Sequence, residues 1–583
     1  MKKIVLLALA ALAGLAMAIA FSSCLGKKEV HLVFYETSDV HGSYFPYDFI
    51  GRSDAPGGLA RVHTFVQEKR AEMGKENVIL MDNGDILQGQ PCAYYYNFID
   101  TTSTHLTAAI LNYMKYDVAA MGNHDVEPGH AVYDRWVDDC EFPVLGANAV
   151  DVYKNAPYWE PYTVLERNGV RIGVLGMITP GIPSWLPEAI WSGIRFEDMV
   201  ETARIWVPVL KEKENVDVII GLFHSGVGKP DAGQVLAENA ATQVAYEVPG
   251  FDVIFCGHDH RAACFQMANA EGDSVWIVNP GAHALNLAAA DMTIQMEGGK
   301  VSDVKVKGSL IDVQNITPDA DFNQTFAPEE QTVKDFTEKV IGNSKNSLQT
   351  RPAFFGPSAF VDFIHGLQLG ISGADISFVA PLSFDAEIPS GDIRVSDMFN
   401  LYKYENLLYV MKLSGQEIKD FMEYSYALWT SQMKSANDHL INFRKGNETA
   451  ADPWQRLQHP SYNFDSAAGL IYTVDVTKPE GQKVTVKSLA NGKPFSLKET
   501  YRVALNSYRG NGGGGHLSKG AGIPKDQLAE RIVWTTQKDL RYFLMQEITR
   551  LHDINPQPLN QWKFVPEKWT DDAARRDAEI LFK

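Results

Sequence analysis

Residue types that bind metal ions follow five short apolar runs in the first half of this sequence. The runs end in Asp, Asn or His, as in VFYETSDVH, VILMDNGD, VAAMGNHD, VIIGLFH and VIFCGHDH. A sixth run, RIGVLGMITP, carries no such residue. The residues delivered in this way are Asp39, His41, Asp85, Asn123, His124, Asp125, His224, His258 and His260. Carboxylate and imidazole side chains together suit Zn²⁺, Mn²⁺ or Fe, and the pattern does not separate these metals.

The pattern along residues 30–311 predicts the elements that position these side chains. Short apolar runs at 78–81, 117–121, 171–178, 216–223 and 251–256 alternate with longer amphipathic stretches, which is typical of parallel strands covered by helices on both faces. In such folds the strand ends meet at one edge of the sheet, so we expect the metal-binding residues to converge there. After residue 282 the pattern predicts an antiparallel hairpin that turns at Gly298 and Gly299.

A cluster of this composition suits the hydrolysis of a phosphate ester. Two cations roughly 3.5–4 Å apart can hold a hydroxide and neutralise the phosphoryl oxygens, and such a site needs one carboxylate shared by both cations. The sequence therefore predicts a two-metal phosphoesterase.

The order and spacing of the motifs resemble the calcineurin-like metallophosphoesterases. The matching segments are Asp39-x-His41, Gly84-Asp85, Gly122-Asn123-His124-Asp125, His224 and Gly257-His258-Asp259-His260. The resemblance implies an α/β fold, a four-layer sandwich of βαβ type. It also implies that one metal is held by Asp39, His41 and His260. The other metal is then held by Asn123, His224 and His258, and Asp85 bridges the two.

The resemblance also gives His124 a catalytic role. In similar enzymes the histidine next to the Asn ligand stabilises the transition state or protonates the leaving oxygen, and an acidic residue orients it. Glu127 is the expected partner here, and Asp125 is the alternative. An imidazole backed by a carboxylate is a suitable general acid near neutral pH.

Two motifs in the C-terminal half resemble the substrate-binding domain of the 5′-nucleotidase family. They are Asn506-Ser507-Tyr508-Arg509-Gly510, followed by a glycine run at 512–515, and Tyr462-Asn463-Phe464-Asp465. The resemblance implies an α+β domain in which two aromatic rings sandwich a nucleobase. Stacking tolerates different bases and contributes roughly 1–3 kcal/mol per base. Tyr508 is the expected first ring and either Phe464 or Tyr462 the second, with Arg509 as a further substrate-binding residue.

Two departures from the 5′-nucleotidase pattern bear on the substrate. The Asn-Gly-Gly-Gly-Ile-Arg segment and the Gly-Gly-Asp-Gly segment of monophosphate-specific members are replaced by VAPLSFDAEIPSGDIR (residues 379–394) and an all-glycine run. The Ala-Pro start of that segment, the following LYKYENLLYVMKLSG (residues 401–415) and Tyr508-Arg509 look more like the 2′,3′-cyclic-nucleotide 2′-phosphodiesterase/3′-nucleotidase branch. A 5′-nucleotidase, or a nucleotide-sugar or polyphosphate hydrolase, is the alternative. A binding protein without activity would be expected to have lost ligands, and every expected ligand is present.

The length of 583 residues predicts more than one domain. Residues 1–24 have the layout of a bacterial lipoprotein signal, with Lys2 and Lys3 before an uncharged run and Cys24 at its end. An uncleaved membrane anchor is the competing interpretation. We expect a catalytic domain at 30–314, a linker with a helix at 315–345 and a substrate-binding domain at 346–583. The protein would then be exported and held to a membrane by a lipid on Cys24.

The bulk composition excludes one class of partner. A net charge of −19 argues against a broad grip on a nucleic acid polymer, which needs a basic face, but it leaves room for a nucleotide substrate at a metal-lined pocket. Of the other cysteines, Cys140 and Cys256 lie in core-like runs. We therefore expect buried thiols and no disulfide framework.

Overall fold

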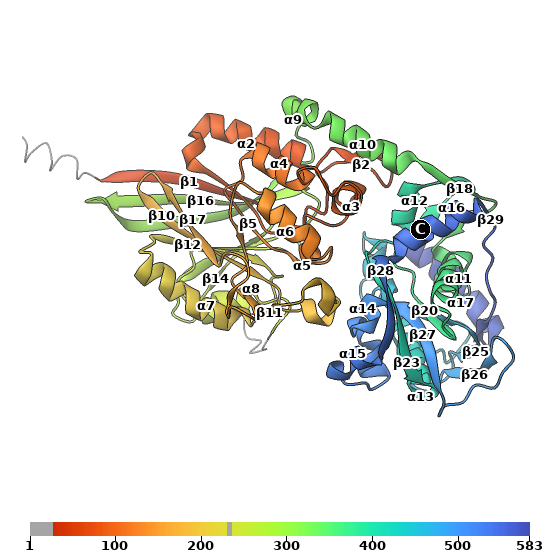
Figure 1. The fold of residues 1–583 in the computed structure, drawn as a ribbon. Helices are drawn as coiled ribbons and strands as arrows, with labels where there is room; N and C mark the ends of the chain where they lie inside the picture. The colour runs from red at the N-terminus through yellow and green to blue at the C-terminus, as the bar shows by residue number, and fades with distance from the viewer. Residues whose placement is uncertain (1–26, 230–235) are drawn as a thin grey trace, which may run out of the picture. The chain divides into compact units, whose positions relative to one another are not determined.

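The computed structural model describes residues 27–229 and 236–583, and the chain forms two compact units (Figure 1). The first unit extends to Glu330, apart from Phe49–Arg52 and Pro183–Ile190, which group with the second unit. The second unit comprises mainly Gln331–Lys583, so the division falls within the range expected as a linker. The expected signal segment, with Cys24, lies outside the described residues.

Two six-stranded sheets form the framework of the first unit. The strand order of the first sheet is β17-β16-β1-β4-β5-β6, and that of the second is β14-β15-β13-β12-β10-β9. The strands of the first sheet are β1 (Lys28–Thr37), β4 (Val78–Asp82), β5 (Val118–Ala120), β6 (Val144–Leu145), β16 (Asn286–Glu297) and β17 (Lys300–Asp312). Those of the second are β9 (Tyr162–Arg167), β10 (Val170–Ile178), β12 (Val218–His224), β13 (Val253–Cys256), β14 (Ala263–Ala268) and β15 (Ser274–Asn279).

The strands that lead to the predicted ligands are parallel neighbours. β1, β4 and β5 pair in parallel in the first sheet, as do β12 and β13 in the second. Strands β6, β10 and β15 extend the parallel parts of the sheets, and β9, β14, β16 and β17 add antiparallel strands. β16 and β17 form the expected hairpin through Gly298 and Gly299, which both have positive φ. Parallel pairing aligns the carboxyl ends of these strands, so the residues that follow them meet at one edge.

Apolar side chains between the two sheets form the core of the first unit. Phe34 and Met81 of the first sheet belong to one buried cluster with Ile220, Leu222 and Phe255 of the second. Each fully buried side chain of this size contributes roughly 1.5–3 kcal/mol. The other face of the second sheet packs on α7 (Met199–Pro208) and α8 (Ala241–Glu247).

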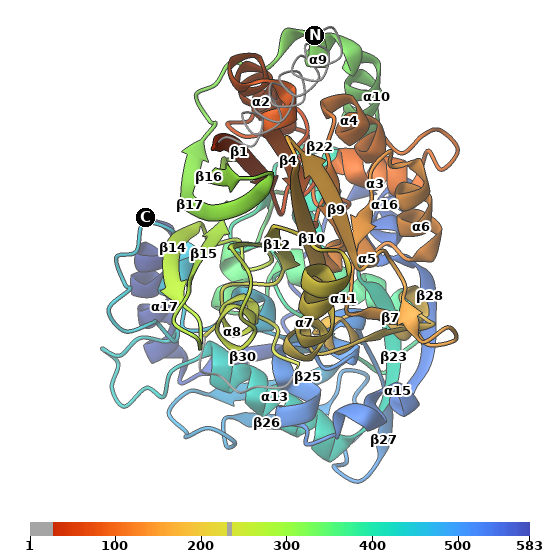
Figure 2. The same ribbon diagram turned by 90° about the vertical axis from the view of Figure 1, so that its left-hand side faces the viewer.

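Helices also cover the first sheet, on the side away from the second sheet (Figures 1 and 2). They include α2 (Leu59–Met73), α3 (Pro91–Phe98), α4 (Leu106–Met114) and α6 (His130–Asp139). The succession helix, sheet, sheet, helix confirms the predicted four-layer α/β sandwich. The expectation of helices on both faces of the strands was wrong, because one face of each sheet packs on the other sheet.

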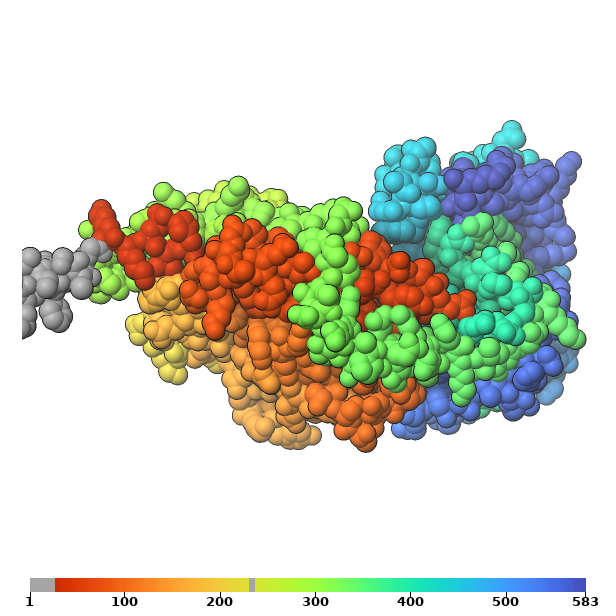
Figure 3. Space-filling view, turned by 90° about the horizontal axis from the view of Figure 1, so that it is seen from above, coloured from red at the N-terminus to blue at the C-terminus, as the bar shows by residue number. Residues whose placement is uncertain are grey.

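The chain returns to α2 after β17. Asp319 donates its backbone N–H to Ala60 O, and Thr64 Oγ1 donates to Thr317 O. In Figure 3 the green surface of this returning segment lies against the red-orange surface of α2. The helices α9 (Ala320–Thr325) and α10 (Ala327–Glu338) follow. These bonds attach the segment that follows β17 to α2 of the first unit.

The second unit is built on a five-stranded mixed sheet of order β24-β20-β27-β23-β28. Its strands are β20 (Ile376–Val379), β23 (Leu407–Ser414), β24 (Ser466–Ala468), β27 (Thr500–Asn506) and β28 (Ile532–Asp539). The principal helices are α11 (Ala359–Ser372), α13 (Gly415–Trp429), α16 (Leu540–Leu551) and α17 (Glu567–Phe582). A smaller sheet joins β25 (Leu470–Asp475), β26 (Val484–Leu489) and β30 (Trp562–Val565). This arrangement is the expected α+β domain.

The described part of the chain carries four free thiols, at Cys92, Cys140, Cys256 and Cys264. Cys92 and Cys256 are buried, whereas Cys140, which was expected to be buried, is only partly so. Burial raises the pKa of the Cys256 thiol well above its usual value. Among the helices of the described residues, none combines the length and the apolar character needed to cross a bilayer.

Candidate metal centre and substrate motifs

The seven predicted metal ligands all lie at or just beyond the carboxyl ends of strands, or in the short helix α5 (Asn123–Val126). Asp39 and His41 follow β1, Asp85 follows β4, and His224 is the last residue of β12. His258 and His260 follow β13, while Asn123 begins α5 after β5. The two sheets therefore deliver side chains to one shared edge of the sandwich.

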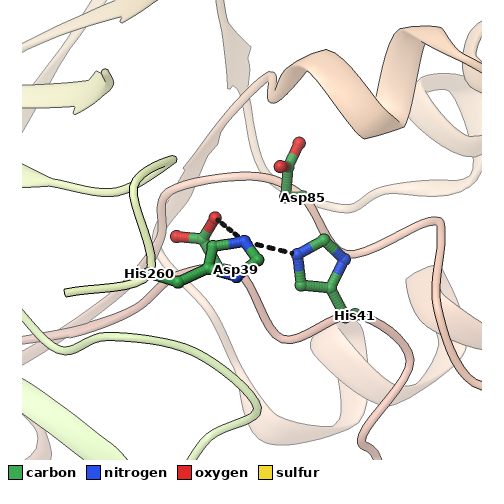
Figure 4. Close-up of side chains that lie close together, drawn as sticks. All are labelled: Asp39, His41, Asp85 and His260. Atoms are coloured by element: carbon green, nitrogen blue, oxygen red, sulfur yellow. Dashed lines mark hydrogen bonds and ion pairs between the residues drawn. The ribbon is translucent and has the colours of Figure 1, made fainter. Parts of the chain in front are cut away.

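The first group of ligand atoms belongs to Asp39, His41, Asp85 and His260, and these atoms lie within 4.8 Å of one another (Figure 4). His260 Nε2 lies 3.3 Å from Asp39 Oδ1 and 3.0 Å from His41 Nε2. Asp39 and Asp85 are almost inaccessible, whereas His260 is exposed. Three of the four side chains in this group are thus buried, and His260 connects the group to the surface.

The second group combines Asp85, His224 and His258, again with ligand atoms within 4.8 Å. His224 Nε2 lies 3.1 Å from Asp85 Oδ2. The Asn123 side-chain oxygen joins this group, because Oδ1 lies 3.1 Å from His224 Nε2 and 2.7 Å from His258 Nδ1. Asp85 is the residue common to both groups, so its carboxylate stands where a bridging ligand is required.

The chemistry of the donor set fits divalent cations. His41 Nδ1 lies 3.1 Å from Gln88 O and His224 Nδ1 lies 2.6 Å from Asn83 O, so in both rings Nδ1 donates and Nε2 faces the centre. Burial lowers the pKa of His41 well below its usual value, which favours the neutral, metal-binding form. His224 differs: burial opposes its charge, but Asp85 raises its pKa to about 10. A proton and a cation therefore compete for His224 Nε2, and metal affinity should rise with pH.

Left-handed backbone turns aim the ligands inward. Asp39, His41, Asp85, His258 and His260 all have φ between 50° and 71°. Non-glycine residues adopt this region at a cost, and such residues cluster at functional sites. These five ligands therefore share a conformation that the surrounding structure must impose on them.

The motif glycines make room for these turns. An added Cβ at Gly84 would lie 2.4 Å from Gly122 N, and one at Gly257 would lie 2.1 Å from Ser38 Oγ. A side chain at either position would push the loops apart. The Gly-Asp and Gly-His pairs in the sequence thus reflect loops that touch at the centre.

His124 lies beside the centre and is paired with Glu127. Its Nδ1 is 2.5 Å from Glu127 Oε2, its ring centroid is 5.4 Å from that of His41, and its backbone N–H donates to Asp85 Oδ1. Burial by itself would lower the pKa of His124, but Asp85 and Glu127 outweigh it and raise the pKa to about 9. The second ring nitrogen, Nε2, remains to donate a proton.

Asp125 has a different environment from the one expected of a catalytic partner. Its carboxylate accepts four backbone N–H groups, from Gly122, Asp85, Ile86 and Leu87, all at 2.8 Å. Both oxygens are thereby occupied. Asp125 ties the loop of Asp85 to that of Asn123, which leaves Glu127 as the partner of His124.

Several residues around the ligands were absent from the predicted set. Ser38 Oγ donates to Asp39 Oδ2 at 2.6 Å, and Asn83 and Gln88 accept from the histidines through backbone oxygens. Glu238 Oε1 lies 3.0 Å from His258 Nε2 and orients that ring. The backbone acceptors lie next to motif residues, but their role does not depend on side-chain type. Glu238 lies far from every motif, so no signal in the sequence marks it.

In the second unit, Tyr508 and Tyr462 lie next to each other. Their ring centroids are 6.4 Å apart with perpendicular planes, and both side chains are half-buried. Gly513 packs directly on the Tyr508 ring, since an added Cβ would lie 2.6 Å from its Cζ. The glycine run therefore supports the Tyr508 ring.

Phe464 and Arg509, two residues predicted to bind substrate, are buried in the scaffold instead. Phe464 is inaccessible and stacks on Trp429 at 5.5 Å, so it has no open face for a base and Tyr462 remains the candidate for the second ring. Arg509 donates to Tyr462 O at 2.8 Å, Gly513 O at 2.6 Å and Asp465 Oδ2 at 2.7 Å. It therefore joins the two predicted substrate motifs to each other. Burial raises the pKa of Asp465, and Arg509 opposes that rise.

Each of the two units matches a known protein family. Residues 32–262 match the calcineurin-like phosphoesterase family, and residues 340–519 match the 5′-nucleotidase C-terminal domain. The chain is 27% identical to the 2′,3′-cyclic-nucleotide 2′-phosphodiesterase/3′-nucleotidase of Salmonella typhimurium over 92% of this chain and 89% of that protein. It is also 27% identical to the trifunctional nucleotide phosphoesterase YfkN of Bacillus subtilis over 93% of this chain, but it spans only 39% of the length of that relative.

A solved structure shares the two-unit fold. The crystal structure of a Staphylococcus aureus protein assigned as a 5′-nucleotidase superposes with a TM-score of 0.75 at 22% identity, covering 92% of this chain and 99% of that one. The fold, the two family matches and the donor set lead to the same classification. The chain is a hydrolase of the metallophosphoesterase family, in which a calcineurin-like phosphoesterase domain is followed by a 5′-nucleotidase C-terminal domain.

Proposed function

We propose that this protein is a two-metal nucleotide phosphohydrolase that opens 2′,3′-cyclic nucleotides and removes the 3′-phosphate. The observation that carries the proposal is the position of Asp85, which belongs to both groups of ligand atoms and lies beside the His124–Glu127 pair. Asp39, His41 and His260 would hold one cation, and Asn123, His224 and His258 the other. When bound, the cations neutralise phosphoryl charge and activate water as the nucleophile.

His124 supplies the proton that the leaving group needs. Glu127 holds Nδ1, so Nε2 is the atom that donates to the departing ribose oxygen. The same acid serves both steps, because opening the cyclic diester and hydrolysing the monoester each release a sugar hydroxyl. A pKa raised by Asp85 and Glu127 keeps the ring protonated at neutral pH, and nearby cations would bring that pKa down.

The C-terminal unit supports the choice of a nucleotide. Tyr508 and Tyr462 are half-buried aromatic side chains that meet at one site, and aromatic faces bind bases with little preference. The similarity to a cyclic-nucleotide phosphodiesterase extends over nearly the whole of both chains. The Asn-Gly-Gly-Gly-Ile-Arg motif of monophosphate-specific enzymes does not occur at residues 379–394, and the glycine run at 512–515 contains no Asp.

Metal identity and location complete the proposal. The mixture of imidazole, carboxylate and amide ligands suits Zn²⁺, Mn²⁺ or Fe. We place the enzyme outside the cytoplasm with a lipid on Cys24, on the strength of the charged, apolar and cysteine-ended layout of residues 1–24. Incorporation of labelled fatty acid into the wild type but not into Cys24→Ser tests the lipid. Equal labelling of both, or of neither, would contradict it.

The activity is tested by phosphate release from a panel of nucleotides with and without a chelator. We expect chelator-sensitive hydrolysis of 2′,3′-cyclic AMP and 3′-AMP, with 2′,3′-cyclic AMP cleaved at least as well as 5′-AMP. A strong preference for 5′-AMP would reassign the protein as a 5′-nucleotidase. Purified, metal-loaded protein that binds nucleotides but hydrolyses none would show a binding protein instead.

A further inference from the structure

An additional histidine, His283, lies at the rim of the metal centre. It belongs to the turn that connects β15 to β16, and its side chain is exposed. Its ring centroid lies 5.6 Å from that of His41 and 6.3 Å from that of His260. His283 belongs to neither group of ligand atoms that lie within 4.8 Å of one another. It therefore adjoins the ligands without taking a position among them.

The backbone at His283 is built into the centre. Its N–H donates to Asp39 O at 2.8 Å, so the turn is bonded to a ligand. On another side the turn contacts Gly57, where an added Cβ would lie 2.2 Å from His283 O. His283 and Ala284 have φ of 61° and 49°, the same left-handed region as five of the ligands. His283 is therefore held by the backbone of the ligand Asp39 and shares the left-handed conformation of the ligands.

Strain of this kind is informative because the side chain it positions is exposed. Two consecutive non-glycine residues in the left-handed region cost free energy, and a glycine would relieve that cost. Because the His283 ring is exposed, its apolar packing offsets little of this backbone strain. A side chain presented in this way next to a catalytic centre indicates a contact with a ligand rather than a role in the core.

We propose that the His283 imidazole binds the phosphoryl group of the substrate. This contact rests on the proposed function, because it requires a substrate phosphate at the metal centre. His124 and His283 both adjoin the His41 ring, at 5.4 Å and 5.6 Å between centroids. A phosphate at the cations would lie within this group of imidazoles. The His283 ring can donate a hydrogen bond to an anionic oxygen there, and charge-assisted bonds of this kind are stronger than neutral ones.

Direct binding of inorganic phosphate tests the proposal without requiring turnover. Phosphate is titrated calorimetrically into the metal-loaded full chain, and bound metal is measured by elemental analysis. For His283→Ala we expect the Kd to rise on the order of tenfold, as for the loss of a hydrogen bond to a charged group, with the metal content unchanged. His283→Asn should lose less, because the amide donates a bond and Asn tolerates the left-handed region. The matched control is His31→Ala, an exposed histidine on β1 that should leave the Kd unchanged.

The possible outcomes distinguish this role from others. A Kd that is unchanged in His283→Ala, or a wild type that binds no phosphate, would overturn the proposal. Loss of metal from the well-folded His283→Asn variant would also overturn it, since the residue would then serve the cations. If phosphate binds with the expected dependence on His283 but no nucleotide is hydrolysed, the proposed function fails and the phosphate contact stands.

Discussion

The metal centre and the aromatic motifs hold their key side chains in opposite ways. At the centre, three of the proposed ligands, Asp39, Asp85 and His224, are among the most buried side chains of the described residues, although His260 is exposed. In the aromatic motifs, the buried members Arg509 and Phe464 are scaffold. Tyr462 and Tyr508, by contrast, are half-buried.

This contrast follows from what each region would bind. Cations need desolvated charges at fixed positions, so burial of the ligands is part of the function. A base needs an open aromatic face, so burial of a ring removes it from the function. Burial must therefore be interpreted differently in the two units. Variants in each should separate chemistry, stability and recognition.

The largest effect is expected for Asp85→Asn, because this side chain belongs to both groups of ligand atoms. Asn keeps the shape and can still accept from the His124 N–H, but it removes the negative charge between the cations. Activity toward every substrate should fall below detection, and elemental analysis should show less bound metal. Unchanged metal content together with unchanged activity would contradict a shared ligand.

The convergence of the predicted ligand side chains could be foreseen from the sequence because strand ends can be recognised locally. Each ligand follows an apolar run, and parallel pairing of β1, β4 and β5 brings distant segments to one edge. The four-layer sandwich and the β16–β17 hairpin were predictable for the same reason. The left-handed turns, by contrast, depend on contacts such as that of Gly257 with Ser38, which no spacing reveals.

The aromatic motifs were less predictable because exposure is a tertiary property. Tyr462 and Phe464 are two residues apart, yet one is half-buried and the other stacks on Trp429. Trp429 comes from α13, which is distant in sequence from that motif. Arg509 is likewise a residue type that often binds phosphate, but here its guanidinium pairs with the buried Asp465 carboxylate. Glu238 and His283 lie outside every motif, and only the fold brings them to the centre.

The next effect in size is expected for His124→Ala. Loss of a positioned general acid typically costs roughly 10²–10⁴ in rate. Metal content should be retained, because His124 is not a ligand in either group. The rate should fall less for nitrophenyl phosphate than for a nucleotide. Nitrophenolate can leave without being protonated, whereas the ribose oxygen must receive a proton as it leaves. Equal losses on both substrates would show that His124 is not the acid.

Arg509→Ala should act on stability rather than on the phosphate chemistry. The change removes the charge that Asp465 faces and the bonds to Tyr462 O and Gly513 O, all in buried surroundings. Breaking such a pair costs about 3–5 kcal/mol. Calorimetric unfolding of the full chain should show a marked destabilisation.

The matched control for Arg509→Ala is Arg351→Ala in the same unit. Arg351 pairs with Asp385 at 2.7 Å, but both side chains are largely exposed, so the cost should be below about 1 kcal/mol. Equal destabilisation by the two changes would argue against a special role for Arg509. Normal stability of Arg509→Ala combined with weaker nucleotide binding would return Arg509 to the substrate contacts.

The smallest effect, and the one that tests the aromatic site most directly, is expected for Tyr508→Ala. If the ring stacks on a base, the change should weaken nucleotide substrates by roughly 1–3 kcal/mol, measured as kcat/KM. Nitrophenyl phosphate has no base and should be almost unaffected, because the metal centre lies in the other unit. Tyr462→Ala should show the same selectivity. Phe464→Leu, a change in the core beside Trp429, should lower stability without changing the ratio between the two substrates. A loss shared equally by nucleotides and nitrophenyl phosphate would overturn the aromatic site and leave the metal centre intact.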